Sequence, residues 1–150
     1  MKITLRNAQP IDEDNVIALW RASGLVVSYN DPAADFRFAQ AAPGSDILVG
    51  QDAKGDIIGT VMVGHDGHRG WLYYVASDPA SRGRGVGRQM VQAAEGWLRE
   101  RGIRKVQLMV RETNTTVASF YEHLGYEVSP RILMAKWLDQ PPEQKPDPTS

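Results

Sequence analysis

Between a strand-like run and a helix-like run, the chain reads Ser81-Arg82-Gly83-Arg84-Gly85-Val86-Gly87-Arg88. Glycines at alternate positions let the backbone turn sharply and come close to a ligand. Apolar residues at helical spacing follow and predict a helix from about Gly85 to Arg101. The free N–H groups of its first turn, its dipole and the nearby arginines favour a negative charge. The segment is therefore interpreted as a phosphate-binding turn.

Composition excludes several classes of protein. A chain of 150 residues suits one domain, and a net charge of -1 does not favour a nucleic-acid or membrane-surface partner. The absence of cysteine excludes disulfides, thiolate zinc sites and cysteine nucleophiles. No apolar run approaches the ~20 residues of a membrane helix. The N-terminus lacks the apolar core of a signal peptide, so a cytoplasmic protein is expected.

Hydrophobic patterning predicts a mixed α/β fold. Turn residues separate short apolar runs, as in an antiparallel hairpin, and Asp12 is expected to cap the first helix. Helices are expected over residues 12–24, 31–42, 85–101 and 114–124, and strands over 3–5, 47–49, 57–63, 71–77 and 106–110, with closing strands over 126–128 and 131–138. We expect a single domain over residues 1–138 and a disordered, proline-rich tail over residues 139–150.

The glycine turn does not fit two common phosphate-binding motifs. A P-loop needs a lysine and a serine or threonine directly after its last glycine, and no such run exists. A dinucleotide-binding turn has a different glycine spacing and comes early in a βαβ unit, whereas this turn follows three strands that read as antiparallel.

Two blocks of sequence resemble the GNAT (Gcn5-related N-acetyltransferase) superfamily. Arg82-x-x-Gly85-x-Gly87 resembles its phosphate-binding signature, and Asn114 followed by Phe120-Tyr121-x-x-x-Gly125-Tyr126 resembles its second conserved element. The resemblance covers roughly residues 3–138 and is strongest to small bacterial proteins near the ribosomal-protein alanine N-acetyltransferases. It implies a mixed, mostly antiparallel central sheet flanked by about four helices.

The resemblance also implies roles for particular residues. The turn, which comprises Arg82, Gly83, Arg84, Gly85, Val86, Gly87 and Arg88, would bind the pyrophosphate of acetyl-CoA, chiefly through backbone amides. The strand end Val75, Ala76 and Ser77 would diverge from the strand over residues 106–111. Its unpaired backbone groups would then bind the pantetheine arm, much as a sheet edge binds a peptide. Asn114 would contact the cofactor near the pantetheine.

Tyr121 is the candidate general acid that the resemblance implies. A phenol can deliver a proton to the departing CoA thiolate. The alternative is a tyrosine that packs on the apolar face of its helix. The general base stays open, because Met109 stands where the resembled enzymes have a glutamate. Glu112, Tyr73, Tyr74 and a water chain are the candidates.

The sequence thus predicts an acetyl-CoA-dependent N-acetyltransferase that needs no metal. Its acceptor would be a primary amine of a small molecule, an amino acid or a protein N-terminus, and transfer would be direct in a ternary complex. Residues 24–38 would line the acceptor cleft, and the lack of an acidic surplus argues against a very basic acceptor. His65-Asp66-Gly67-His68 is interpreted as a polar loop rather than a metal site.

Three alternatives accompany this prediction. The chain could be a non-catalytic acyl-CoA sensor or partner-binding module, which Met109 keeps open. It could be a toxin-type member of the superfamily that acts on charged tRNA, although the balanced charge argues against it. The apolar run over residues 132–134 could pair two copies as a homodimer, or could equally be a buried strand.

Overall fold

The computed structural model describes residues 2–139. The chain divides into two compact units at Leu108 and Met109. The first unit holds the sheet, and the second holds one helix and the segment that follows it.

The first unit is built on a five-stranded sheet in the order β1-β2-β3-β4-β5. The neighbours from β1 to β4 pair antiparallel, and β5 pairs parallel with β4. This confirms the expected mixed, mostly antiparallel sheet. The strands are β1 (Thr4–Asn7), β2 (Ser45–Gln51), β3 (Ile57–His65), β4 (Gly70–Ser77) and β5 (Val106–Gln107).

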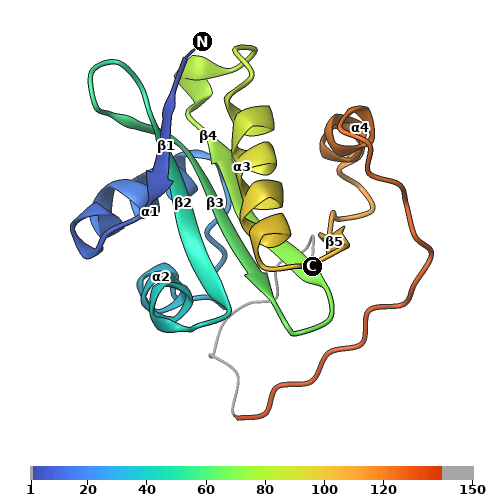
Figure 1. Cartoon of the computed structure of the whole chain (residues 1–150). Coiled ribbons are helices and arrows are strands. Elements are labelled where there is room, and N and C mark those ends of the chain that lie inside the picture. The colour runs from blue at the N-terminus through green and yellow to red at the C-terminus, as the bar shows by residue number, and fades with distance from the viewer. Residues whose placement is uncertain (1, 140–150) are drawn as a thin grey trace. The chain divides into compact units, whose positions relative to one another are not determined.

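Helices cover both faces of this sheet (Figure 1). The first unit holds α1 (Glu13–Ala22), α2 (Pro32–Ala41) and α3 (Val86–Glu100), together with the short 3-10 turns Pro10–Asp12 and Pro79–Ser81. Alternate side chains of a strand point to opposite faces. Ile47 and Val49 of β2 accordingly pack under α1 and α2, while Gly50 faces Met90 of α3. The fourth helix, α4 (Thr115–His123), belongs to the second unit, so the expected number of helices is confirmed within residues 2–139.

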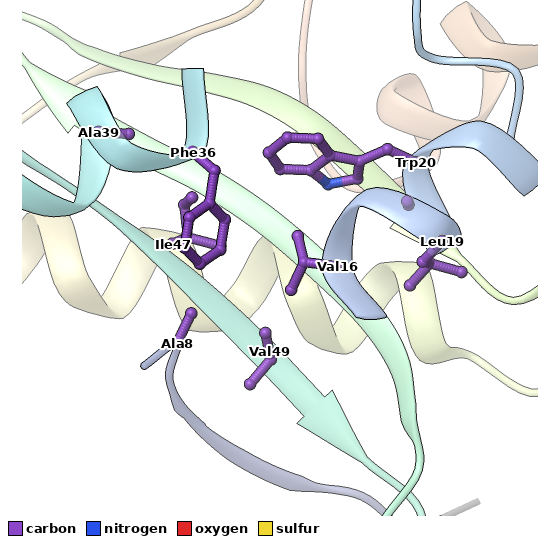
Figure 2. Close-up of a cluster of buried hydrophobic side chains, with 9 residues drawn as sticks. Ala8, Val16, Leu19, Trp20, Phe36, Ala39, Ile47 and Val49 are labelled. Carbon is purple, nitrogen blue, oxygen red and sulfur yellow. The ribbon is translucent and has the colours of Figure 1, made fainter. Parts of the chain in front are cut away.

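One half of the core lies between the sheet and the pair α1 and α2 (Figure 2). Trp20 and Phe36 are fully buried there, with ring centroids 6.4 Å apart. The Trp20 indole N–H donates to Thr60 Oγ1 at 3.1 Å, which satisfies a polar group that would be costly to bury alone. The other half of the core lies under α3 and includes Met90, Val91 and Leu98.

Asp12 does not cap α1 with its side chain, contrary to the sequence prediction. Its carboxylate accepts two hydrogen bonds from the Arg6 guanidinium, at 2.7 and 3.0 Å, and one from the backbone N–H of Gln9 at 2.7 Å. The side chain is buried against β1, where a cationic partner stabilises it better than a helix terminus would.

The second unit differs most from the sequence prediction. Asn114 caps α4, because its Oδ1 accepts the N–H of Val117 at 3.2 Å. The strand expected over residues 106–110 ends at Gln107, and no strand forms within the described residues 126–139. Apolar content suggested those closing strands. A strand also needs a ladder partner, however, and apolar content does not specify one. Ile132 and Met134 are accordingly exposed.

Two further expectations concern the whole chain. Within residues 2–139, no helix is long and apolar enough to cross a membrane. The proline-rich tail expected over residues 139–150 lies, from residue 140 on, outside the described residues.

Candidate functional site

The glycine turn connects β4 to α3 through two left-handed residues. Gly83 has a φ of 79° and Gly85 a φ of 78°, a conformation that side chains with a Cβ rarely adopt. A Cβ built at either position would meet nothing within 4 Å, so backbone conformation rather than space selects glycine here. The turn is open to a ligand on its outer side.

Backbone amides at the start of α3 have no helical partner. The first helical hydrogen bond runs from the N–H of Gln89 to the carbonyl of Gly85 at 3.1 Å. The N–H groups of Val86, Gly87 and Arg88 precede it, so no carbonyl of the same helix accepts them. Arg82, Arg84 and Arg88 are exposed around these groups. The turn therefore combines oriented donors, a helix dipole and positive side chains, which suits a phosphate group.

The segment before the turn is firmly held. The carboxylate of Asp78 accepts the N–H of Ala80 at 3.0 Å, and its carbonyl accepts the N–H of Ser81 at 2.8 Å. The N–H of Asp78 donates to the carbonyl of Ile58 at 2.8 Å, which ties the turn to β3. These bonds fix the start of the glycine turn relative to the sheet.

The edge of β4 is open next to this turn. β4 pairs with β5 only at Gly70–Val106 and Trp71–Gln107. Beyond these pairs, no described strand of the first unit pairs with Leu72–Ser77 on that side. Val75, Ala76 and Ser77 lie on this open edge and lead directly into the turn.

A β-bulge interrupts the pairing of β4 with β3. Thr60 pairs with Ala76 and Met62 with Tyr73, so Tyr74 and Val75 together oppose Val61. Tyr74 has a φ of 50°, the only positive φ of a non-glycine residue described. Such a conformation is costly for a tyrosine and concentrates at functional sites.

Three contacts hold Tyr74 in this conformation. Its ring stacks on Trp20 with centroids 3.9 Å apart and an interplanar angle of 13°. Its carbonyl accepts the Thr60 hydroxyl at 3.2 Å, and its own hydroxyl donates to Asp35 Oδ2 at 2.7 Å. The bulge also brings Tyr73 and Tyr74, although adjacent in sequence, to the wall of the same cavity.

That cavity has a volume of about 650 Å³ and lies within the first unit, between α2 and the β3–β4 hairpin. Its size falls in the range of small-molecule sites. Its wall is mostly apolar, and its charged groups are two carboxylates. The lining residues are Asn30, Asp35, Phe38, Ala39, Ala42, Gly44, Ser45, Met62, Val63, Gly64, His65, Asp66, Trp71, Tyr73 and Tyr74.

The pKa values of the cavity tyrosines disfavour them as general bases. Burial, together with the hydrogen bond to Asp35, raises the pKa of Tyr74 well above its ordinary value. Burial and the Asp66 charge also raise the pKa of Tyr73. A base must be deprotonated before it can accept a proton, so these phenols are poor candidates for that role.

The polar loop Asp66–Arg69 is closed by its own hydrogen bonds. Asp66 Oδ1 accepts the N–H groups of His68 and Arg69 at 2.9 and 2.8 Å, and these bonds lower the pKa of the carboxyl. His65 Nδ1 accepts the N–H of Gly67 at 3.1 Å. The loop thus uses its ligand-like atoms to hold its own turn, in line with the polar-loop interpretation.

The second unit holds the remaining predicted site residues. Tyr121 is buried on α4, edge-to-face with Phe120 at 5.0 Å and Tyr126 at 5.5 Å between ring centroids. Burial raises its pKa to about 12, so the phenol keeps its proton at neutral pH. Met109 and Glu112 are exposed. The turn and the β4 edge thus lie together in the first unit, whereas Asn114 and Tyr121 lie in the second.

Sequence reasoning missed Asp35 and Thr60. Asp35 lies inside a helix that begins at the Asp31 cap, where an exposed carboxylate is ordinary. Thr60 lies in an apolar strand and gives no signal of the bulge that it supports. The neighbouring tyrosines at 73 and 74 were the only available hint, since they interrupt the alternation expected of a strand.

Comparisons with known proteins identify relatives along nearly the whole chain. The model of the Acetyltransferase (GNAT) family matches residues 14–126. An acetyltransferase of Pectobacterium atrosepticum is 39% identical over 127 residues, which cover 85% of this chain and 89% of that protein. An acetyltransferase of Sodalis glossinidius is 37% identical, over 82% of this chain and 86% of its own.

Solved structures share the fold. A putative acetyltransferase from Agrobacterium tumefaciens superposes with a TM-score of 0.75 at 23% identity, over 90% of this chain and 100% of its own. AAC(6')-Iy, in complex with the bisubstrate analogue CoA-S-monomethyl-acetylneamine, superposes with a TM-score of 0.78 at 18% identity, over 91% of this chain and 99% of its own. At these identities the likeness concerns the fold.

Proposed function

The chain belongs to the GNAT family of acetyltransferases, and on this basis we propose that it moves an acetyl group from acetyl-CoA to a primary amine by direct transfer in a ternary complex. The observation that carries the proposal is the continuity of the open β4 edge with the glycine turn. The glycine turn suits the pyrophosphate of acetyl-CoA, and the open edge of β4 suits the amides of its pantetheine arm.

The pyrophosphate of acetyl-CoA binds at the start of α3. Amides from Gly83 to Arg88 donate to its oxygens, and the left-handed glycines turn the backbone so that these amides converge. Arg82, Arg84 and Arg88 add long-range attraction for an anion rather than a fixed contact, because their side chains are exposed.

The pantetheine arm extends along β4. Its amides pair with backbone groups of Val75, Ala76 and Ser77, as an added strand would. This pairing places the thioester beside the bulge at Tyr74, where a backbone N–H near Val75 polarises the carbonyl.

The transfer replaces the C–S bond of the thioester by a C–N bond. The neutral amine attacks the carbonyl carbon, a C–N bond forms and the C–S bond breaks. The amine proton leaves to water, and the departing thiolate gains a proton to give free CoA. Tyr121 is the proposed donor of that proton, and its raised pKa keeps the phenol protonated at neutral pH. Asn114 lies at the start of the same helix, near the pantetheine in this proposal.

Acetyl transfer can be measured by the free thiol of CoA that it releases. The chain has no cysteine, so a thiol reagent detects CoA without background from the protein. We expect thiol release that depends on both acetyl-CoA and an added amine. Binding of acetyl-CoA without amine-dependent thiol release would instead identify a non-catalytic acyl-CoA sensor, the alternative that Met109 keeps open.

Tyr121→Phe tests the proton donor. We expect kcat to fall at least about tenfold while the KM for acetyl-CoA stays unchanged, because only the transition state uses this proton. Tyr126→Phe is the matched control, since it removes a hydroxyl from the ring that packs against Tyr121. Equal rates for Tyr121→Phe and the wild type would contradict the assignment.

A further inference from the structure

The cavity between α2 and the β3–β4 hairpin carries a negative charge that the composition of the whole chain conceals. The net charge of the chain is only -1, yet the charged groups that line the cavity are Asp35 and Asp66. No lysine or arginine is among the described lining residues. The charge of the cavity lining therefore favours a cationic acceptor, although the net charge of the whole chain does not.

The two carboxylates lie toward different ends of the cavity. Asp35 accepts the hydroxyl of Tyr74, and Asp66 Oδ2 accepts the indole N–H of Trp71 at 3.3 Å. Tyr74 and Trp71 are three residues apart on β4, which places their Cα atoms about 10 Å apart in an extended strand. Both carboxylates also keep capacity for a ligand, because an ionised carboxylate can accept about four hydrogen bonds.

Aromatic side chains form the wall between these ends. Trp71 and Tyr73 lie nearly parallel, with an interplanar angle of 19° and ring centroids 6.5 Å apart. Phe38 stands at the rim and is 78% exposed, although Phe36 on the same helix is fully buried. An exposed aromatic beside carboxylates attracts an organic cation through its ring face and also contacts the apolar part of that cation.

We propose that this cavity is the acceptor site, and that it takes an organic amine with two ammonium groups, one for each carboxylate. This inference rests on the acetyl transfer proposed above. The reacting nitrogen lies at the Tyr74 end, because Tyr74 directly precedes Val75 and the proposed thioester position. Asp35 attracts that end of the acceptor, and Asp66 with Trp71 binds the second ammonium group.

A matched set of amines tests the inference. Acetyl transfer is measured with four amines. A straight-chain heptane diamine has both ammonium groups, aminoheptanol replaces one of them by a hydroxyl, and heptylamine lacks it. Propane diamine has both ammonium groups on a shorter chain. We expect the KM of the heptane diamine to be at least about tenfold below the others, as one additional charged contact would give. Equal KM values across the set would overturn the inference and leave the acetyl transfer intact.

Two substitutions assign the preference to the cavity. Asp66→Asn keeps the oxygen that accepts the loop amides but removes the charge, so we expect the KM of the diamine to rise about tenfold and that of heptylamine to stay unchanged. Asp35→Asn keeps a partner for the Tyr74 hydroxyl and should raise the KM of every amine. Asp14→Asn, at an exposed carboxylate of α1 outside the cavity, is the control and should change none.

Calorimetry separates failure of the cavity from failure of the chemistry. The heptane diamine is titrated into the wild type and into Asp66→Asn, each with CoA present. Binding that is weakened in the variant supports the cavity assignment even if no acetyl group is transferred, in which case the proposed function alone fails. No binding to a wild type that transfers acetyl groups to other amines would overturn the cavity assignment alone.

Discussion

Tyr74 shows how a single residue can couple the core to the site. Its left-handed backbone is unfavourable by itself, yet the ring stack on Trp20, the hydroxyl of Thr60 and the carboxylate of Asp35 all favour it. Trp20 and Thr60 are buried and hydrogen-bonded to each other, so the strained residue rests on a rigid base. The bulge is thus set before any ligand arrives.

Tyr74→Phe should weaken the fold measurably. The substitution keeps the ring stack and removes the hydrogen bond to Asp35, so we expect the unfolding free energy in urea to fall by about 1–2 kcal/mol. Tyr73→Phe removes a hydroxyl from the same cavity but leaves this bond, and should change the unfolding free energy by less than about 0.5 kcal/mol. Similar losses in the two variants would contradict the role given to the Tyr74 hydroxyl.

The pair of Arg6 and Asp12 makes stability depend on pH in a defined direction. Hydrogen bonds from Arg6 hold the pKa of the Asp12 carboxyl below its ordinary value. A lowered pKa in the folded state means that this stabilisation is present above about pH 4 and is lost as the pH falls through the lowered value.

Asp12→Asn should therefore lose its effect in acid. At neutral pH we expect the substitution to lower the unfolding free energy by about 2 kcal/mol, because Arg6 loses its charged partner. The difference from the wild type, measured by urea unfolding across the acid range, should shrink steadily below about pH 4. A difference that stays constant with pH would show that the pair does not act through its charge.

At the scale of elements, glycines decide how closely α3 approaches the sheet. A Cβ at Gly70 would lie 2.5 Å from Leu98 Cδ1, and a Cβ at Gly59 would lie 2.8 Å from Val86 Cγ1. These strand positions face the helix and leave no room for a methyl group. Because α3 carries the amides of the glycine turn, this packing also fixes where the proposed phosphate site lies.

Gly70→Ala should destabilise the fold through overpacking, by about 1–3 kcal/mol in urea unfolding. Gly96→Ala on α3 is the opposite control, since a Cβ there meets nothing within 4 Å. It should stabilise the protein by up to about 1 kcal/mol through helix propensity. In the double mutant Leu98→Ala/Gly70→Ala, the unfolding free energy should be higher than in Leu98→Ala alone, because the new methyl group fills space that Leu98 occupied. Additive losses of unfolding free energy would exclude a contact between residue 70 and Leu98.

Most elements could be predicted from the sequence because each carries its own periodicity. Asp31 caps α2, Gly85 begins α3 and Asn114 caps α4 where local chemistry requires them. The strands predicted within residues 126–138 do not form, because a strand depends on a partner that apolar content alone does not specify. The cap predicted at Asp12 was wrong for a related reason, since this carboxylate has a stronger partner in Arg6 of β1.

The candidate site could be predicted only where it follows a linear motif. The turn from Arg82 to Arg88 lies between a strand and a helix, where its spacing placed it. The cavity, in contrast, combines Asp35 of α2 with Tyr73 and Tyr74, which the bulge in β4 brings to its wall. No local pattern encodes such a juxtaposition, so the charge of the whole chain does not reveal the two carboxylates of the cavity.

At the scale of the whole molecule, the tyrosines predict alkaline lability. Tyr73, Tyr74 and Tyr121 have a raised pKa, mainly through burial. Above about pH 10 the folded chain therefore keeps protons that the unfolded chain has released. The unfolding free energy should stay level up to that pH and then fall as the pH rises further.

Spectroscopic titration checks this directly. Part of the tyrosinate absorbance of the native protein should appear only at a higher pH than in urea, where a single stage near pH 10 is expected. A native titration that coincides with the one in urea would show that these phenols are hydrated.

Acetyl-CoA is proposed to bind at the glycine turn, and calorimetry of acetyl-CoA binding tests this proposal. Gly87→Glu places a carboxylate in the first turn of α3, where it suits the helix dipole but repels a phosphate. Gly96→Glu makes the same substitution in open space further along the same helix. We predict that Gly87→Glu abolishes binding and that Gly96→Glu leaves it unchanged. Equal affinity of the wild type and Gly87→Glu would contradict the claim.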